Sequence, residues 1–255
     1  MIKILFSDFD GTMYLHDENG DYMPEENLKA LQKFRESGCH FVITTGRPQG
    51  VFLQLSEGMG LGNDYICANG SISVYDDGTR IVRFMDSTKA RGVFEIVREN
   101  IDPRKFCYYT DDGRTVLYEH NDDYIDTFNE NDGHISSITL ITNTHHDLDL
   151  CERLIRERFG DEVTFSPPEA ILADITEKGV NKGRTIEEFC EHYGISREET
   201  AGIGDGRNDL AIFAAVNLKF AMNDGSEELK KAADYCVDSA AEAIEMIMKR
   251  NEEEA

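Results

Sequence analysis

The sequence predicts an α/β protein with a Rossmann-like, doubly wound parallel-sheet core into which a second, α+β domain is inserted. Two observations support this prediction. Toward both ends of the chain, short apolar runs typical of buried strands alternate with segments whose apolar residues recur at helical spacing. In the middle, β-like runs follow one another more closely, which is typical of an α+β module. We therefore expect a discontinuous core of residues 1–84 and 179–255 and an inserted domain of residues 85–178.

The first part of the core begins with the apolar run of residues 2–7, which is expected to form a buried strand. A helix is expected at residues 24–37, where Leu28, Leu31 and Phe34 recur at helical spacing. The further elements expected in this part are a strand at 39–43, a helix at 48–58, a strand at 65–68 and a hairpin of 72–75 with 81–84.

The inserted part and the second part of the core follow in order. In the inserted part we expect a helix at 88–100, β-like runs at 106–110 and 115–120, a polar stretch at 121–134, a strand at 136–142, a helix at 147–159 and β-like runs at 162–166 and 171–176. After the insertion we expect a helix at 182–193, a strand at 200–204, a helix at 207–215, a strand at 218–221, a helix at 226–233, a strand at 235–237 and a helix at 239–250.

The charge balance is strongly acidic. The chain has 26 Lys and Arg against 50 Asp and Glu, which gives a formal net charge of -24. Such a field repels phosphate backbones and anionic lipids, so neither nucleic acid nor a membrane is expected as a partner. It also repels phosphorylated metabolites. A phosphate site in this chain would therefore need local cations, either basic side chains or a bound metal.

The sequence lacks the features of an exported protein. The apolar residues before Asp8 are too few for a signal-peptide core, and no later apolar run approaches about 18 residues. The six cysteines are dispersed without a CxxC pair, which favours reduced thiols over disulfides or a zinc site. We expect a cytoplasmic protein, and the sequence does not indicate its oligomeric state.

Asp8 and Asp10 directly follow the first expected strand, in the sequence DFDGT at residues 8–12. A chain this acidic contains roughly ten acid-x-acid triplets by chance, so the triplet alone says little. Its position says more. Ligand crevices of α/β sheets lie at the carboxyl ends of strands, and acids there are costly unless they bind a metal or act as a pair.

Two further motifs lie at the ends of expected elements. In ITTGRP at residues 43–48, Thr45, Gly46 and Arg47 could offer an anion a hydroxyl, backbone N–H groups and a guanidinium. The alternative is an ordinary strand-to-helix turn. Lys182 lies in GVNKG at the expected start of a helix, where the helix dipole disfavours a cation. Either a nearby anion or simple exposure to solvent would explain it.

The sequence GIGDGRND at residues 202–209 is the most specific of the motifs. An expected strand ends in a Gly-flanked Asp205, and a second acid, Asp209, follows four residues later. If residues 207–215 are helical, Asp205 caps the helix and Asp209 lies on the same face one turn later. Two hard oxygen ligands would then converge, as Mg²⁺ prefers. An N-cap needs no metal, but it explains neither the three glycines nor Asp209.

In order and spacing, these four motifs resemble those of the haloacid-dehalogenase-like superfamily. Asn69 and Asn223, with the residues around them, further resemble its Cof-type branch, in which an α+β cap lies between the second and third motifs. The resemblance covers residues 2–82 and 179–238, whereas the insertion matches in size and pattern. It implies a Mg²⁺-dependent phosphatase that acts on small phosphorylated metabolites beneath a closing cap.

The resemblance also implies roles for the acids. Asp8 would be the nucleophile that forms an aspartyl-phosphate, and Asp10 would be the general acid and base. Mg²⁺ would be bound by the Asp8 carboxylate, the Asp10 backbone carbonyl and Asp205. Asp209 would be a ligand through water or would orient the others.

The basic and polar motif residues would bind the phosphoryl group. Thr45 and the Gly46 N–H would bind its oxygens, Lys182 would neutralise their charge, and Asn208 would bind phosphate or orient Lys182. Arg47 would either reach the substrate or pair with an acid and brace the loop.

The remaining candidates lie at the rim and in the cap. Asn69 and Asn223 would lie near the rim of the site, unless they are only turn residues. The candidates in the cap for binding the leaving group are Tyr108, Tyr109, Tyr118, His120 and Arg91. Strand packing or solvation explains each of them, so no cap residue is assigned.

Two other functions stay open. One is phosphoryl transfer within a sugar, as in the phosphomannomutases that share this core. The other is a phospho-accepting signalling module, because receiver domains also combine an Asp, a Thr and a Lys on an α/β sheet. Asp10 and the cap-sized insertion argue against the second.

Overall fold

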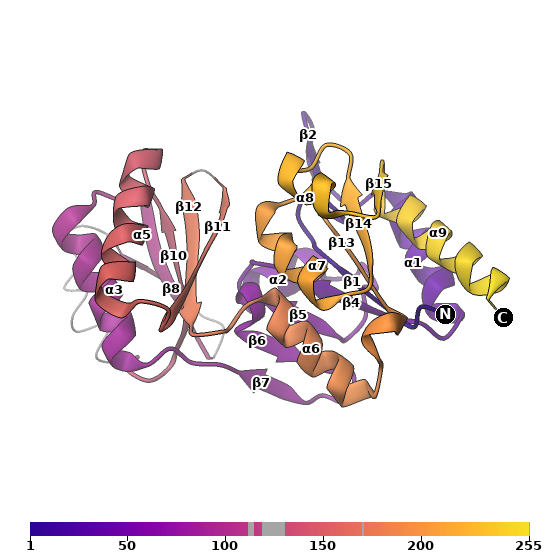
Figure 1. The fold of residues 1–255 in the computed structure, drawn as a ribbon, viewed down its shortest axis with the longest axis horizontal. Coiled ribbons are helices and arrows are strands. Elements are labelled where there is room, and N and C mark those ends of the chain that lie inside the picture. Colours follow the sequence, from indigo (N-terminus) through magenta and orange to yellow (C-terminus); the bar gives the residue numbers. More distant parts are fainter. Residues whose placement is uncertain (112–114, 119–130, 170, 255) are drawn as a thin grey trace.

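The computed structural model describes residues 1–111, 115–118, 131–169 and 171–254, so His120 and most of the polar stretch predicted at 121–134 lie outside the described residues. The described chain folds around two main sheets, one of eight strands and one of five (Figure 1). None of the described helices is both long enough and apolar enough to cross a membrane.

The larger sheet forms the core. Its order is β15-β14-β13-β1-β4-β5-β6-β7; neighbours from β15 to β5 pair in parallel, and β6 and β7 are added antiparallel. The predicted α/β core with a mostly parallel sheet is therefore confirmed. Its strands are β1 (Ile4–Ser7), β4 (His40–Thr44), β5 (Tyr65–Cys67), β6 (Ile72–Val74), β7 (Arg80–Val82), β13 (Thr200–Gly204), β14 (Leu218–Met222) and β15 (Tyr235–Val237).

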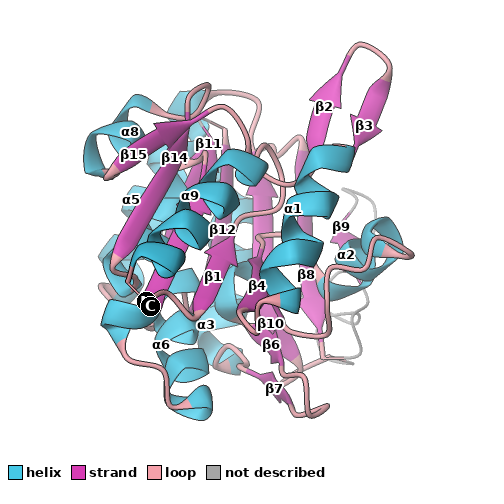
Figure 2. Ribbon diagram, turned by 90° about the vertical axis from the view of Figure 1, so that its right-hand side faces the viewer, coloured by secondary structure: helices cyan, strands magenta, loops and turns pink. Residues whose placement is uncertain are grey.

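Helices cover both faces of this sheet because its central strand is apolar on both sides. In β1, Leu5 packs with one group of helices, whereas Ile4 and Phe6 pack with the other. In the first group, α1 and α9 lie side by side over the sheet (Figure 2). The first group is α1 (Glu25–Glu36), α2 (Gln49–Ser56) and α9 (Ala240–Glu253), and the second is α6 (Lys182–Tyr193), α7 (Leu210–Ala215) and α8 (Glu227–Ala232).

The smaller sheet is built from the predicted insertion and is antiparallel, in the order β11-β12-β10-β8-β9. It lies between its two covering helices, α3 and α5, and the core (Figure 1). The elements are α3 (Ser87–Asn100), β8 (Lys105–Thr110), β9 (Thr115–Tyr118), β10 (Ile135–Ile141), α5 (His145–Phe159), β11 (Val163–Glu169) and β12 (Leu172–Glu177). The chain passes between the sheets after β7 and after β12, and the boundaries we propose, after residues 84 and 178, fall in these connections.

One hairpin is absent from the predicted elements. β2 (Leu15–Asp17) and β3 (Gly20–Tyr22) pair antiparallel. The segment is polar and does not alternate, so it has no strand pattern. The available signal was the Asn19-Gly20 pair, which is typical of a tight turn.

Candidate active site

Most of the predicted site residues meet at one edge of the larger sheet. β13, β1 and β4 are adjacent and parallel, so residues that follow their carboxyl ends lie side by side. Asp8 follows β1, Thr45 follows β4 and Asp205 follows β13. The Asp8 N–H donates to the carbonyl of Ile203 at 2.9 Å, which holds the loop after β1 against β13.

Three carboxylates gather beyond these strand ends. Oxygens of Asp8, Asp205 and Asp209 all lie within 4.8 Å of one another. Burial is the larger cause and the charge of Asp209 the second cause of two raised pKa values. The pKa of Asp205 is raised to about 6, and the pKa of Asp8 is raised well above its ordinary value. These shifts reflect negative charge that the surrounding residues do not fully neutralise. Oxygen donors in such a setting suit a hard divalent cation.

Lys182 places a positive charge inside this cluster. Its Nζ lies 2.6 Å from Asp8 Oδ1 and 2.6 Å from Asp209 Oδ1, and its side chain is 1% exposed. Burial alone would lower the pKa of Lys182, but the Asp209 and Asp8 carboxylates raise it, so the ammonium stays charged. The solvent-exposed alternative for Lys182 is therefore wrong. A nearby anion explains a cation at the start of α6.

Asp209 organises the loop after β13. Its Oδ2 accepts the backbone N–H groups of Asp205 at 3.0 Å and Gly206 at 2.9 Å. The prediction that Asp205 caps a helix at 207–215 is wrong, because that segment begins with a 3₁₀ turn at Arg207–Asp209 and α7 follows it. Asp209 accepts these N–H groups instead. The Asp205 carboxylate is therefore free to join the acidic cluster.

Two glycines allow the acids to approach one another. Gly11 has a φ of +76°, and a Cβ built there would overlap the Asp205 carboxylate. A Cβ at Gly204 would overlap the Asp209 side chain. Glycine at both positions is therefore a condition for the cluster, and at Gly11 it is also required by the positive φ.

Asp10 pairs with Arg47. Arg47 Nε lies 2.8 Å from both carboxylate oxygens of Asp10, and Arg47 Nη2 lies 2.5 Å from Oδ1. In the same loop the Arg47 N–H donates to Thr45 Oγ1 at 3.0 Å. The pair links the loop after β1 to the loop after β4, as the bracing alternative for Arg47 describes.

The acidic cluster opens into a cavity of about 850 Å³ that both sheets line. On the core side the lining includes Asp8, Asp10, Gly46, Arg47, Asp205 and Asn208. On the side of the smaller sheet it includes Lys105, Tyr109, Thr139, Ile141, Leu172 and Asp174. Sequence reasoning assigned none of this second group. The one clear signal in this group was Asp174, an acid between the apolar residues Ala173 and Ile175.

The structure separates the two asparagines expected at the rim. Asn69 has a left-handed φ of 50°, is buried beside Gly46 and donates from Nδ2 to Asp174 Oδ2 at 2.6 Å. Asn223 is exposed and donates to Asp238 at 2.5 Å. Neither asparagine is among the residues that line the cavity, but Asn69 contacts Asp174, which is one of them. Only Asn69 is brought to the site.

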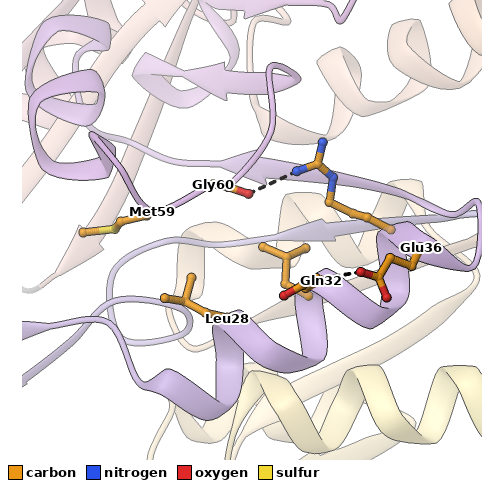
Figure 3. A pocket seen from close by; sticks show the side chains of 7 residues that line it. Leu28, Gln32, Glu36, Met59 and Gly60 are labelled. Carbon is orange, nitrogen blue, oxygen red and sulfur yellow. Dashed lines mark hydrogen bonds between the residues drawn. The ribbon is translucent and has the colours of Figure 1, made fainter.

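A second cavity, of about 540 Å³, lies beside α1 and the segment after α2 (Figure 3). Its polar side chains bind one another or the backbone. Gln32 Nε2 donates to Glu36 at 2.8 Å, and Arg35 Nη1 donates to the Gly60 carbonyl at 3.1 Å. Because Glu36 is the only acid among the described residues that line it, we place the chemistry in the first cavity.

The fold and the acidic cluster define an α/β protein with a cluster of carboxylates beside a cavity that a second sheet also lines. The chain belongs to the haloacid dehalogenase-like hydrolase family, whose model matches residues 5–245. The predicted superfamily is therefore confirmed.

Individual relatives agree with the family match. The 5-amino-6-(5-phospho-D-ribitylamino)uracil phosphatase YcsE of Bacillus subtilis is 26% identical, with 94% of this chain and 92% of YcsE covered. A phosphoglycolate phosphatase of Methanothermobacter thermautotrophicus is 24% identical, with 97% and 99% covered. In fold, the chain is similar to the subclass IIB sugar phosphatase BT4131, with a TM-score of 0.79, 21% identity and coverage of 96% and 98%. These comparisons confirm the predicted class of enzyme and its Cof-type branch.

Proposed function

We propose that this hydrolase is a Mg²⁺-dependent phosphatase that cleaves small phosphomonoesters, such as sugar phosphates, through an aspartyl-phosphate on Asp8. The observation that carries the proposal is the buried Lys182, which bridges Asp8 and Asp209 at 2.6 Å each beside the cavity. A phosphoryl group needs local cations in a chain with a net charge of -24, and Lys182 provides one next to the nucleophile.

The reaction has two steps. In the first, an Asp8 carboxylate oxygen forms a bond to phosphorus while the ester P–O bond breaks, and Asp10 gives a proton to the leaving alkoxide. In the second, Asp10 takes a proton from the water that attacks the acyl-phosphate. This step releases inorganic phosphate and restores Asp8. Arg47 holds Asp10 at the cavity, and its charge favours the ionised carboxylate that acts as the base in the second step.

The loop after β4 binds the phosphoryl oxygens. Thr45 Oγ1 already accepts the Arg47 N–H at 3.0 Å, so its own hydrogen is directed to another acceptor, for which a phosphoryl oxygen is suited. The Gly46 N–H and Asn208 supply further donors at the cavity, and Lys182 balances the charge.

The residues present fit a Mg²⁺ ion. Its ligands would be the carboxylates of Asp8 and Asp205 and the backbone carbonyl of Asp10, with Asp209 beside them. The buried cluster has three carboxylates for the single ammonium of Lys182, so a divalent cation would balance it. When bound, Mg²⁺ supplies positive charge that brings the anionic nucleophile and the anionic phosphoryl group together.

Acid quench after mixing with ³²P-labelled p-nitrophenyl phosphate and Mg²⁺ tests the nucleophile. Asp10→Asn should accumulate labelled protein, because p-nitrophenolate leaves without a proton whereas the second step needs a base. Asp8→Asn should show neither label nor turnover, and EDTA should stop the native enzyme. Asp149→Asn, on the exposed side of α5, is the matched control and should keep the native rate. Turnover by Asp8→Asn would contradict the assignment, and isomerised hexose phosphate without phosphate release would instead favour a mutase.

A further inference from the structure

Asp174 is a buried acid on the side of the cavity that the smaller sheet, here called the cap, lines. It lies in β12 between Ala173 and Ile175, which pack into the hydrophobic core beneath α3 and α5. Because side chains alternate along a strand, Asp174 faces the opposite way and lines the cavity that also contains Asp8. The residue is nevertheless only 8% exposed. A carboxylate in such a position is costly unless its acceptor sites are used.

Two neutral donors contact this carboxylate. Thr139, directly opposite on β10, donates to Oδ1, and Asn69 of the core donates to Oδ2 at 2.6 Å. An ionised carboxyl group has about four acceptor sites, so two donors leave about half of them unused. Burial raises the pKa of Asp174 to about 6, as expected for a carboxylate that its neighbours do not fully satisfy. Asp174 is one of the residues that line the cavity, so a bound ligand could supply the missing donors.

The neighbours of Asp174 indicate what would fill those sites. Asn69 lies against Gly46, where a Cβ would be 3.2 Å from Asn69 Nδ2, so the carboxylate is one side chain away from the proposed phosphate loop. The leaving group of a bound ester would lie in the cavity between them. Lys105 lies on the same side of the cavity, and its charge makes an ammonium group an unsuitable occupant. A neutral donor suits this position better, and a hydroxyl group is the neutral donor that sugars and polyols carry.

We propose that Asp174 sets substrate specificity by accepting a hydrogen bond from a hydroxyl group of the leaving group, so that phosphorylated polyols and sugars are the substrate class. This inference rests on the proposed phosphatase function. The contact with Asn69 gives Asp174 a second effect, because the same carboxylate holds the smaller sheet against the core. The experiment has to separate these two effects.

Matched substrates separate them. Glycerol 3-phosphate and propyl phosphate have the same carbon chain and differ in their hydroxyl groups, as do sorbitol 6-phosphate and hexyl phosphate. The native enzyme should have the higher kcat/KM for the hydroxylated member of at least one pair. In Asp174→Ala this preference should fall by about 10- to 100-fold, the usual effect of losing a hydrogen bond to a charged group. Asp174→Asn keeps the shape of the side chain and should lose most of the preference while folding normally.

Asn69→Ala is the matched control. It removes the contact between core and cap but keeps the Asp174 carboxylate, so it should lower kcat/KM for both members of a pair by the same factor. Equal losses for both members in Asp174→Ala and Asp174→Asn, with turnover retained, would show that Asp174 only holds the cap and would overturn the inference. Absence of phosphate release by the native enzyme from these esters and from p-nitrophenyl phosphate would overturn the phosphatase assignment itself.

Discussion

Lys182 is the residue on which the buried charges of the site depend. Removing one member of a buried ion pair leaves its partners without compensation and costs about 3–5 kcal/mol. We therefore expect Lys182→Met to lower the free energy of unfolding by about that amount at pH 7 without Mg²⁺, measured by urea denaturation. Lys178→Met is the control, because Lys178 contacts Glu162 at 2.5 Å but is 56% exposed and should contribute little. Equal stabilities of the two variants would contradict a charged, buried Lys182.

Because Asp174 is a buried acid, we expect the free energy of unfolding to depend on pH. Its pKa is raised by burial from an ordinary value of 3.8 to about 6, so the fold favours the protonated form. The resulting penalty is absent below the unfolded pKa and is complete once the pH has risen through about 6, where it reaches about 3 kcal/mol. Asp174→Asn removes this penalty.

The stability of Asp174→Asn relative to the native protein should therefore increase between pH 5 and pH 8, by about 1–2 kcal/mol. Urea unfolding at the two pH values measures it. Asp149→Asn, an exposed substitution on α5, shows how far any aspartate replacement changes the same difference. A pH-independent gain in Asp174→Asn would mean that folding does not raise the pKa of this carboxyl group.

At the scale of residues, the motif acids were predictable and their partners were only partly so. Asp8 and Asp205 follow strands that the sequence predicts, so their meeting follows from the parallel sheet. The burial of Lys182 depends on how α6 packs, which the local sequence does not contain. Asp174 contacts Asn69, which is 105 residues away in the chain, and no local pattern indicates that contact.

The turn after β1 is the element whose backbone lets Asp205 approach Asp8. Gly11 has a φ of +76°, and a Cβ there would overlap the Asp205 carboxylate. Gly11→Ala should therefore displace Asp205 and lower kcat by about 100-fold or more, since a misplacement of about 1 Å in an active site has that effect. Steady-state kinetics with p-nitrophenyl phosphate measure it.

Gly38→Ala is the control for backbone strain. Gly38 has a φ of +84°, but a Cβ there would meet nothing within 4 Å. The variant should lose about 1 kcal/mol of stability and keep the native kcat. If both variants lost activity equally, strain in the backbone, rather than the approach to Asp205, would explain the role of Gly11.

At the scale of elements, the accuracy of prediction followed the strength of the local pattern. The helix predicted at 182–193 and the strands at 200–204 and 235–237 have the observed bounds of α6, β13 and β15. The helix predicted at 207–215 failed in its first turn, because the Asp209 carboxylate binds the N–H groups of Asp205 and Gly206. A side chain that binds backbone groups replaced regular helical structure there.

At the scale of the whole molecule, the alternation of strands and helices predicted the layers. The residues that line the cavity could be identified only from the structure. Which side chains of the smaller sheet line the cavity depends on the register of its strands. Thr139 pairs with Asp174, and Ile141 pairs with Leu172. A shift by one residue would direct the apolar residues of these strands at the site instead. Hydrophobic pattern alone does not determine how that sheet then sits on the core.

The net charge of -24 leads to a prediction about salt. The far field of the protein repels an anionic ester, and local cations such as Lys105 and Arg47 attract it only near the cavity. Raising the total ionic strength, Mg²⁺ salt included, with KCl from about 10 to about 150 mM shortens the Debye length from about 30 Å to about 8 Å, which removes the repulsion over most of the approach. At constant, saturating Mg²⁺ we expect kcat/KM for p-nitrophenyl phosphate to rise roughly two- to fivefold, with kcat unchanged.

A variant with Gln in place of the exposed Glu245, Glu252 and Glu253 of α9 should show a smaller rise, because it carries less of the repelling charge. A fall of kcat/KM with added salt would mean that attraction by the cavity outweighs the far field along the whole approach. In that case the acidic surface would have no part in substrate capture, and the affinity for phosphate esters would depend on the local cations alone.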